Sequence, residues 1–511
     1  MKTHPLAAAM GAFLAASTLV AVTPAPTDIR VLRHENVLGT SFELRVRSRD
    51  ATIATNAEAL ILGEIDRLAR VFSTYSPASE FSRWQSTRGM AIPVSPELME
   101  VMGLAHRWRL ATDGAFHPGA AWFGKLWRDA ATSGGEPTTT ALADGVRLLR
   151  TQPWSVDASA GTALRVGDYP TTLDAVAKGW IIERASQRAW ALGGMEGMLL
   201  EIGGDLRVCG NWPERIALVD PRHDEENARP LGWVDVQDAA LATSGGYRRQ
   251  VGAPTHDRRR SHIIDPRTGI PAEEVLGATV IAPDGATADA LSTSFCVMEP
   301  SASLRLADAT PGVACLLVLP DGGVATSARW PSMARWVAET NAPGPAVATN
   351  APPSFELTLA FELRSPSGGR YQRPYVAAWV EDADGFPVRT LLLWVLQSQK
   401  GQRWVPDLRR WHKGDDTRRL VDDKDLLATV SGATRNPGKY SVRWDGKDDH
   451  GKAVKPGKYT LCLEAAREHG SYQLMKHPFT LGTDNFAADL KGNEEFTGAR
   501  VEGRRIPSRR P

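Results

Sequence analysis

Cysteine is scarce in this chain, which has four cysteines in 511 residues. Cys209, Cys296, Cys315 and Cys462 are widely scattered, and none of them stands at a metal-ligand spacing from another. The sequence therefore gives no indication of a cysteine-based metal site. Export from the cytoplasm would permit disulfides, but the spacing identifies no pair.

An excess of either charge is also missing. The 60 Lys and Arg residues stand against 59 Asp and Glu residues, which leaves a formal net charge of +1. This balance gives no general reason to expect a nucleic-acid partner. With 42% hydrophobic and 23% charged residues the composition is that of a soluble globular protein. The length exceeds what one ordinary core accommodates, so we expect two or three domains.

A long apolar run lies in the first 26 residues. Leu6 to Val22 has no charged residue, Lys2 precedes it, and Thr23-Pro24-Ala25 offers small residues for cleavage. This pattern is typical of a secretory signal peptide, so we expect residues 1–26 to direct the protein to the periplasm. An uncleaved anchor helix at the inner membrane is the alternative, because the run is borderline in length. No cysteine lies near enough to carry a lipid anchor.

The stretch from Ser261 to Thr293 is the one around which we expect the rest of the chain to be organised. Ala278 to Ala282 is a short β-branched run, Pro283-Asp284-Gly285 is a turn, and Ala286 to Met298 has helical composition. In such a helix Asp289 and Thr293 are one turn apart and share a face. A carboxylate and a hydroxyl there would form one side of an oxygen site that suits Mg²⁺. From spacing alone, a helix cap and a surface residue remain the alternative.

Upstream segments have patterns that would support such a site. Thr40 to Arg47 alternates like a strand, and Ala57 to Phe72 has apolar residues at helical spacing. Ser95 and Pro96 are typical of the start of a helix, with five residues predicted to face inward: Leu98, Val101, Met102, Ala105 and Trp108.

A further helix is predicted to begin at Leu173 and to carry Lys178 in its first turns. A cation is unfavourable at that end of a helix unless an anion is near, and a bound phosphate would remove the conflict. A solvated lysine is the alternative. Met198 to Ile202 reads as a buried strand that ends in Gly203-Gly204-Asp205, where the glycines permit close approach of a ligand.

Six short motifs occur in one order along the chain: Ser73-Thr-Tyr-Ser-Pro, Leu173-Asp-Ala-Val-Ala-Lys-Gly, Glu201-Ile-Gly-Gly-Asp-Leu, Ala242-Thr-Ser-Gly-Gly-Tyr, Ser261-His-Ile-Ile-Asp-Pro-Arg-Thr-Gly and Ala288-Asp-Ala-Leu-Ser-Thr. In this order they resemble the ApbE-type FAD:protein FMN transferase family over about residues 30–335. Several motifs in sequence are far more specific than any one of them.

The resemblance implies a Mg²⁺-dependent periplasmic enzyme that cleaves the pyrophosphate of FAD. It would transfer FMN to a threonine of an acceptor protein, at a Ser/Asp-Gly-Ala-Thr type of sequence, and release AMP. The metal would be held by Ala175, Asp289 and Thr293, Lys178 would face the phosphates, and His262 would accept the hydroxyl proton. The resemblance further assigns the FAD site to Leu38, Tyr75, Ala115, Phe116, His117, Thr172, Lys178 and Ile263.

Some positions depart from the family pattern. His117 and Thr172 stand where the family commonly has Asp, Gly119 replaces a usual Thr, and Leu38 replaces a common Met. These departures concern flavin affinity and specificity more than the metal chemistry. Two alternatives stay open: a hydrolase that cuts FAD to FMN and AMP, and a flavin-binding or carrier protein without turnover.

The composition changes after Trp336. We expect an α+β ApbE-like domain over 27–338, a Pro/Ala linker over 339–354, an all-β sandwich of Ig-like size over 355–482 and a disordered tail over 483–511. The sandwich prediction rests on five short strand-like runs: Phe355 to Leu363, Tyr375 to Glu381, Val388 to Leu396, Tyr440 to Trp444 and Tyr459 to Glu464.

Short runs in this second half, such as Trp379-Val-Glu-Asp and Arg467-Glu-His-Gly, resemble a family of predicted periplasmic domains of unknown function. Ser431-Gly-Ala-Thr434 matches the short sequence that acceptors of the transferase family carry, so Thr434 is a candidate self-acceptor. A β-turn is the alternative, because four-residue matches arise easily by chance.

Overall fold

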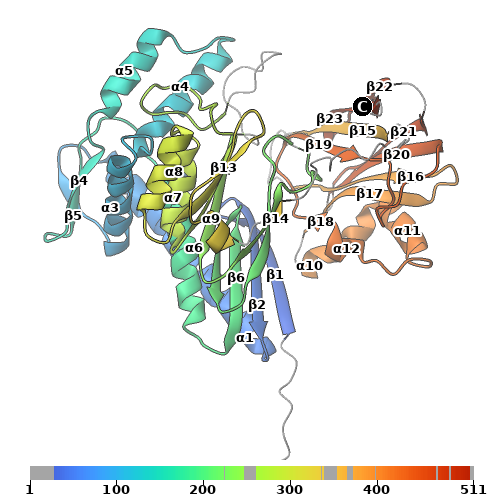
Figure 1. Cartoon of the computed structure of the whole chain (residues 1–511), viewed down its shortest axis with the longest axis horizontal. Coiled ribbons are helices and arrows are strands. Elements are labelled where there is room, and N and C mark those ends of the chain that lie inside the picture. The colour runs from blue at the N-terminus through green and yellow to red at the C-terminus, as the bar shows by residue number, and fades with distance from the viewer. Residues whose placement is uncertain are drawn as a thin grey trace, which may run out of the picture.

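The computed structural model describes residues 28–223, 225–246, 261–334, 337–338, 354–364, 372–396, 399–467, 470–482 and 485–506. The predicted signal peptide 1–26, most of the predicted linker and Tyr247 of the fourth motif lie outside these residues. Within them, no helix is long and apolar enough to cross a membrane. The chain forms two parts, a first over 28–338 and a second over 354–506, which lie side by side (Figure 1).

An eight-stranded antiparallel sheet forms the centre of the first part, in the order β1-β2-β6-β7-β10-β11-β12-β13. Its strands are β1 Asp28–Val37, β2 Thr40–Ser48, β6 Met195–Ile202, β7 Asp205–Gly210, β10 Ala240–Gly245, β11 Gly277–Ala282, β12 Ala314–Val318 and β13 Val324–Thr326.

Both faces of this sheet are covered. In β6, Met198 and Leu200 join the core under the helices, whereas Leu199 joins a separate core on the opposite face. In β11, Val280 and Ile281 divide in the same way. Successive side chains of a strand point to opposite faces, so these strands read as continuous apolar runs rather than alternating ones.

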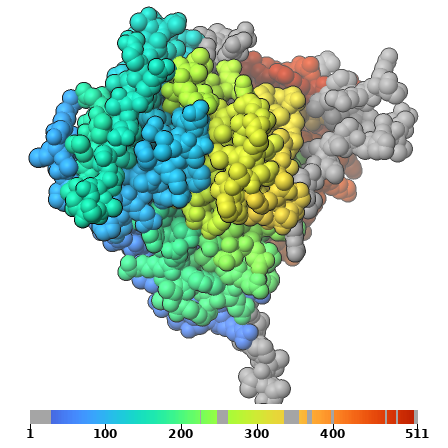
Figure 2. All heavy atoms as spheres, turned by 60° about the vertical axis from the view of Figure 1, so that its left-hand side comes forward, coloured from blue at the N-terminus to red at the C-terminus, as the bar shows by residue number. Residues whose placement is uncertain are grey.

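Most of the helices lie on the first face, whereas the second is covered by the small sheet β14-β9-β8 and by α9, whose Trp330 and Ala334 join the second core. The helices are α1 Ala51–Phe72, α2 Glu80–Ser86, α3 Pro96–Ala111, α4 Ala121–Thr132, α5 Thr139–Leu149, α6 Asp174–Trp190, α7 Gly285–Phe295, α8 Pro300–Ala309 and α9 Trp330–Ala334. Two three-stranded sheets complete this part: β3 Ala91–Pro93, β5 Thr162–Arg165 and β4 Trp154–Asp157, and β14 Val337–Ala338, β9 Gly232–Val236 and β8 Glu214–Leu218. Figure 2 shows the helical side, with α3 in blue next to the yellow segment that includes α8.

The predicted helix after Ser95 is confirmed. Ser95 is its N-cap, and the side-chain oxygen accepts a hydrogen bond from the N–H of Leu98 at 3.2 Å. The five residues predicted to face inward are the five that are buried in α3. Local patterning and capping were sufficient to define this element.

The second part is a sandwich of two β-sheets around an apolar core. Its four-stranded sheet has the order β19-β15-β23-β22, and its five-stranded sheet the order β18-β17-β16-β20-β21. The strands are β15 Ser354–Leu363, β16 Tyr375–Glu381, β17 Pro387–Trp394, β18 Ser431–Gly432, β19 Gly438–Trp444, β20 Gly457–Ala466, β21 Tyr472–Leu481, β22 Phe486–Lys491 and β23 Phe496–Ile506. Helices α10 Gln399–Gln402, α11 Arg409–Arg418 and α12 Leu426–Thr429 stand between β17 and β18.

The prediction of a disordered tail over 483–511 is wrong for most of its length. Residues 486–506 form β22 and β23, and β23 lies in the interior of its sheet against β15. Phe496 and Val501 are fully buried in the sandwich core. The segment has many arginines and glutamates and few apolar residues, so its composition suggests disorder. In the strand the charged side chains lie on the outer face and the apolar ones face the core.

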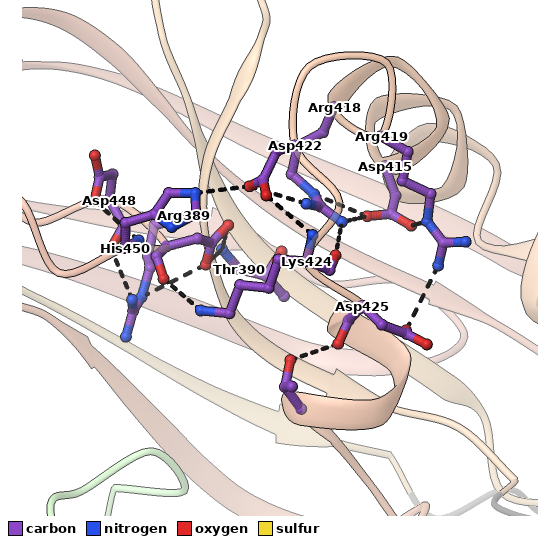
Figure 3. A network of polar contacts seen from close by, with 12 residues as sticks. Arg389, Thr390, Asp415, Arg418, Arg419, Asp422, Lys424, Asp425, Asp448 and His450 are labelled. Atoms are coloured by element: carbon purple, nitrogen blue, oxygen red, sulfur yellow. Dashed lines mark hydrogen bonds and ion pairs between the residues drawn. The ribbon is translucent and has the colours of Figure 1, made fainter.

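A polar network fastens the helical insertion to the sandwich (Figure 3). The buried guanidinium of Arg418 bonds Asp415 at 2.7 Å and lies 3.1 Å from Asp422. Asp422 also contacts His450 at 2.8 Å, and Lys424 bonds the carbonyl oxygen of Asp449. These charges are paired with one another, so we assign the network a structural role rather than a catalytic one.

Candidate active site

Helices α6 and α7 cross at two glycines. A Cβ atom on Gly179 would lie 2.0 Å from the carbonyl oxygen of Gly285, and a Cβ on Gly285 would lie 2.2 Å from that of Gly179. The backbone N–H of Gly179 donates to Oδ2 of Asp289 at 3.0 Å. The two glycines thereby bring the segment around Lys178 into contact with the helix that carries Asp289.

Helix α7 is almost completely buried, and Thr293 is its one residue that is not. The helix begins at the N-cap Asp284, whose carboxylate accepts from the N–H of Thr287 at 2.8 Å. Asp289 is 4% exposed, and Oγ1 of Thr293 lies 3.2 Å from Oγ of Ser244 at the end of β10. The predicted strand, turn and helix are thus confirmed, although the helix ends at Phe295 rather than at Met298.

Asp205 lies next to Lys178. It follows the turn Gly203-Gly204, where both glycines have positive φ angles of 61° and 93°, and it opens β7. Its buried carboxylate lies 2.8 Å from Nζ of Lys178, which is itself about one-third exposed. Lys178 is therefore held by a carboxylate of the neighbouring hairpin and is not a freely solvated lysine.

The charges at this crossing are unbalanced. Burial and the negative charge of Asp205 together raise the pKa of Asp289 to about 8, against the opposing charge of Lys178. Burial likewise raises the pKa of Asp205, which Lys178 lowers. Two buried carboxyl groups share one ammonium, so the site favours an additional positive charge, either a proton or a cation.

A divalent cation with oxygen ligands fits this arrangement. No cluster of three or more His, Cys, Asp and Glu side chains suited to a metal occurs in the described part of the chain. A metal here would therefore need the Asp289 carboxylate together with hydroxyl and carbonyl oxygens, a ligand set that suits Mg²⁺ better than Zn²⁺. In a regular helix the N–H of Gly179 donates to the Ala175 carbonyl oxygen. Here the same N–H also donates to the carboxylate of Asp289.

Two candidate flavin contacts lie at exposed tips of the first part. Tyr75 is 88% exposed in a turn whose backbone N–H groups at Tyr75 and Ser76 donate to Oγ of Ser73. Leu38 lies between β1 and β2 with a φ of +49°, an uncommon conformation for a branched residue, and packs partly against the main core.

The other candidate flavin residues lie deeper. Ala115, Phe116 and His117 are all buried. Nδ1 of His117 accepts the N–H of Gly119 at 2.9 Å, and burial, aided by the charge of Arg109, lowers the pKa of His117 to about 4. This imidazole is neutral at physiological pH. Thr172 joins the segment to α6, because its N–H donates to the Pro118 carbonyl and its hydroxyl accepts from Asp174.

His262 and Ile263 precede a tight loop. Ile263 donates its N–H to Oγ of Ser261 and accepts from the N–H of Ala272. The loop is closed by Asp265, whose carboxylate pairs with Arg267 at 2.9 Å. His262 is partly exposed.

Sequence reasoning missed Asp205 and Ser244 as site residues. Both stand in motifs that were recognised, Glu-Ile-Gly-Gly-Asp-Leu and Ala-Thr-Ser-Gly-Gly-Tyr, but only the glycines of the former were given a role. One signal in the sequence could have identified Asp205. Its carboxylate directly follows Gly203-Gly204 at the end of a predicted strand, and that strand follows the predicted helix that carries Lys178.

Comparison with known proteins follows the same division of the chain. The ApbE family matches residues 38–317, and a family described as "Predicted periplasmic protein (DUF2271)" matches residues 356–498. An FAD:protein FMN transferase of Vibrio cholerae is 30% identical over 51% of this chain and 80% of its own length. One of Rhodobacter capsulatus is 29% identical over 62% of this chain, but the match spans only 60% of that protein. The crystal structure of the ApbE protein of Thermotoga maritima is similar with a TM-score of 0.53 and 27% identity, over 60% of this chain and 99% of that one.

Proposed function

Because the chain belongs to the ApbE family, we propose that its first part is a Mg²⁺-dependent FAD:protein FMN transferase. The observation that carries the proposal is the juxtaposition of Lys178, Asp205, Asp289 and Thr293 where α6 crosses α7. This juxtaposition supplies a fixed ammonium and an oxygen site beside one helix start, which are the parts that phosphoryl transfer needs.

In the reaction the hydroxyl oxygen of an acceptor threonine bonds to the phosphorus of the FMN half of FAD, and the bond from that phosphorus to the AMP oxygen breaks. Mg²⁺ held by the Ala175 carbonyl, Asp289 and Thr293 would supply charge neutralisation on the pyrophosphate. Lys178 binds a phosphate oxygen, and His262 accepts the hydroxyl proton. AMP leaves with the electrons of the broken bond.

The flavin half would lie between the exposed ring of Tyr75 and Leu38, in front of the buried segment Ala115 to His117. Thr172 and Ile263 would border it. An anion is favoured near the start of α6 by the helix dipole.

The acceptor is a separate protein with a Ser/Asp-Gly-Ala-Thr type of sequence. Thr434 in this chain has that context, but it is 2% exposed and its hydroxyl donates to the carboxylate of Glu35. Self-modification would require the two parts to separate at this point. We place the reaction in the periplasm after export by residues 1–26, and the family described as predicted periplasmic that the second part matches supports this location.

The test is AMP release from FAD by the mature protein, with and without Mg²⁺, in the presence of a domain that bears an acceptor threonine. We expect AMP and an FMN mass on the acceptor. Asp289→Ala should reduce the rate at least about 100-fold because it removes the charged metal ligand. Asp144→Ala, which removes an exposed carboxylate on α5, is the matched control and should leave the rate unchanged.

The alternatives give different products. AMP release without a label on the acceptor would identify a hydrolase of FAD. Bound FAD without AMP under any condition would identify a flavin carrier and would overturn the transferase proposal.

A further inference from the structure

The second part contacts the first at the hairpin that carries Leu38. The carboxylate of Glu35, near the end of β1, accepts the backbone N–H of Thr434 at 2.9 Å and also the hydroxyl of Thr434. Arg373 donates to Oδ1 of Asn36 and lies 3.8 Å from Glu35. Two residues separate Glu35 from Leu38, so these bonds are made at the base of the hairpin tip.

The tip is a two-residue turn of Leu38 and Gly39 between the paired residues Val37 and Thr40, and it follows an irregular stretch of β1. The regular pairing of β1 with β2 is interrupted between His34 and Val37. Asn36, Leu38 and Gly39 all have positive φ angles, of 64°, 49° and 79°. Positive φ is unfavourable for a leucine, so contacts that hold the hairpin help to keep Leu38 in this conformation. Thr434 and Arg373 are the residues of the second part that contact the hairpin.

A second set of contacts joins the two parts through the loop between β8 and β9. Asn227, in the loop between β8 and β9, donates to the carbonyl oxygen of Arg443 at 2.7 Å and accepts its N–H at 2.9 Å. Glu225 pairs with Arg443 at 2.6 Å, and Glu226 pairs with Arg435 at 3.0 Å. Docking of the two parts therefore does not depend on Thr434 and Arg373 alone.

We propose that the second part is an intramolecular clamp that holds the β1–β2 hairpin in the conformation in which Leu38 contacts the flavin. The proposal rests on the proposed function for the role of Leu38, and it gives the second part a task in flavin binding. Without the clamp the hairpin samples other conformations, and the apparent affinity for FAD falls in proportion to the lost population.

The test compares two full-length variants that each remove two side-chain hydrogen bonds between the parts. Arg373→Ala combined with Thr434→Val releases the hairpin, whereas Asn227→Ala loosens the other contact and serves as the control. Hydrogen exchange of the peptide that spans residues 34–40 and FAD binding followed by flavin fluorescence are measured on both, together with KM and kcat for AMP release.

We expect faster exchange at residues 34–40 and a roughly five- to tenfold weaker Kd and higher KM for FAD in the double variant, with kcat within about twofold. The control should match the wild type in all four quantities. Unchanged exchange and affinity in the double variant, or equal changes in both variants, would overturn the clamp while leaving the transferase proposal intact. A wild-type protein that binds FAD but releases no AMP defeats the transferase proposal alone, because exchange and affinity still decide the clamp.

Discussion

Two buried carboxylates and one lysine set the chemistry of the helix crossing. Asp289 has a part in the proposed metal site, whereas Asp205 contacts Lys178 instead. A lysine side chain has several rotatable bonds and loses much freedom when it is fixed. Asp205 therefore acts as a positioning residue that fixes the ammonium before FAD arrives.

Replacement of Asp205 by Asn should separate this role from folding. Asn keeps the shape and one acceptor oxygen but removes the charge that holds Lys178, so we expect kcat for AMP release to fall about tenfold or more. Asp235→Asn is the control and should have no effect on kcat. Asp235 lies on β9 and pairs there with Arg215 of β8. Steady-state AMP release at saturating FAD and Mg²⁺ measures both, and an unchanged kcat in Asp205→Asn would contradict the role.

His117 makes the stability of the protein depend on pH. Its folded-state pKa of about 4 lies below the value of about 6.5 expected in the unfolded chain, so the unfolded state binds the proton first. The resulting stability is fully present above pH ~6.5 and is lost as the pH falls toward ~4, by about 2–3 kcal/mol at pH ~4.5.

The check is urea unfolding of the wild type and His117→Asn between neutral and mildly acidic pH. Asn can accept the N–H of Gly119 in place of Nδ1 but does not titrate. The variant should therefore lose about 2–3 kcal/mol less than the wild type over this range. Parallel pH profiles for the two proteins would show that His117 is not the group responsible.

The pairing of residues across the site could be predicted only where it is local. Asp289 and Thr293 lie one helical turn apart, so their shared face follows from periodicity. The contact of Lys178 with Asp205 depends on how the β6–β7 hairpin lies over α6, and no local pattern contains that information. The buried state of His117 likewise depends on packing against Tyr169, which comes from a distant segment.

At the scale of elements, the crossing of α6 and α7 places the site. Gly179 and Gly285 allow the two backbones to approach more closely than any side chain would permit. Lys178 and Asp289 are in register with each other because of this approach, so the geometry of the site depends on residues that take no part in the chemistry.

Gly179→Ala should therefore be severely destabilising. The added Cβ would meet the backbone of α7, which cannot rotate away, and we expect a loss of about 3 kcal/mol or more together with loss of AMP release. Gly103→Ala in α3 is the matched control: its Cβ would meet no atom within 4 Å. That change should stabilise the helix by about 0.5–1 kcal/mol. Urea unfolding followed by far-UV circular dichroism distinguishes the two, and similar stabilities would contradict the close approach.

Elements with a clear apolar period were predicted well, and those with a mixed composition were not. Helix α3 and the strands β15 and β16 match their predicted positions closely. Strands β22 and β23 were missed because charged residues alternate with short apolar ones such as Ala499 and Val501. Strand β23 pairs with β15, which comes early in the second part, and β22 pairs with β23, so only long-range pairing makes them strands.

At the scale of the whole molecule, all four cysteines are buried thiols. Cys209, Cys296 and Cys315 lie in the first part and Cys462 in the second. Burial raises the pKa of the first three to about 12 and also raises that of Cys462. Because the thiolate is the reactive form, native protein should resist alkylation.

We expect no labelling by iodoacetamide in the native protein and four labels in denaturant, as counted by mass spectrometry. At intermediate urea concentrations the position of the first label reports which part opens first. Rapid labelling of Cys462 under native conditions would contradict the packing described for the sandwich.

The position of β23 also bears on how the protein is made. Every strand of the first sheet precedes every strand of the second part in the chain, so a chain that emerges N-terminus first can complete the first sheet before the second part assembles. Strand β15 is the first of the second part to emerge, and it lies between β19 and β23. One of its edges therefore stays open until β23 is complete. A ribosome that stalls before Phe496 leaves an exposed strand edge, which is a target for chaperones, for proteases and for aggregation.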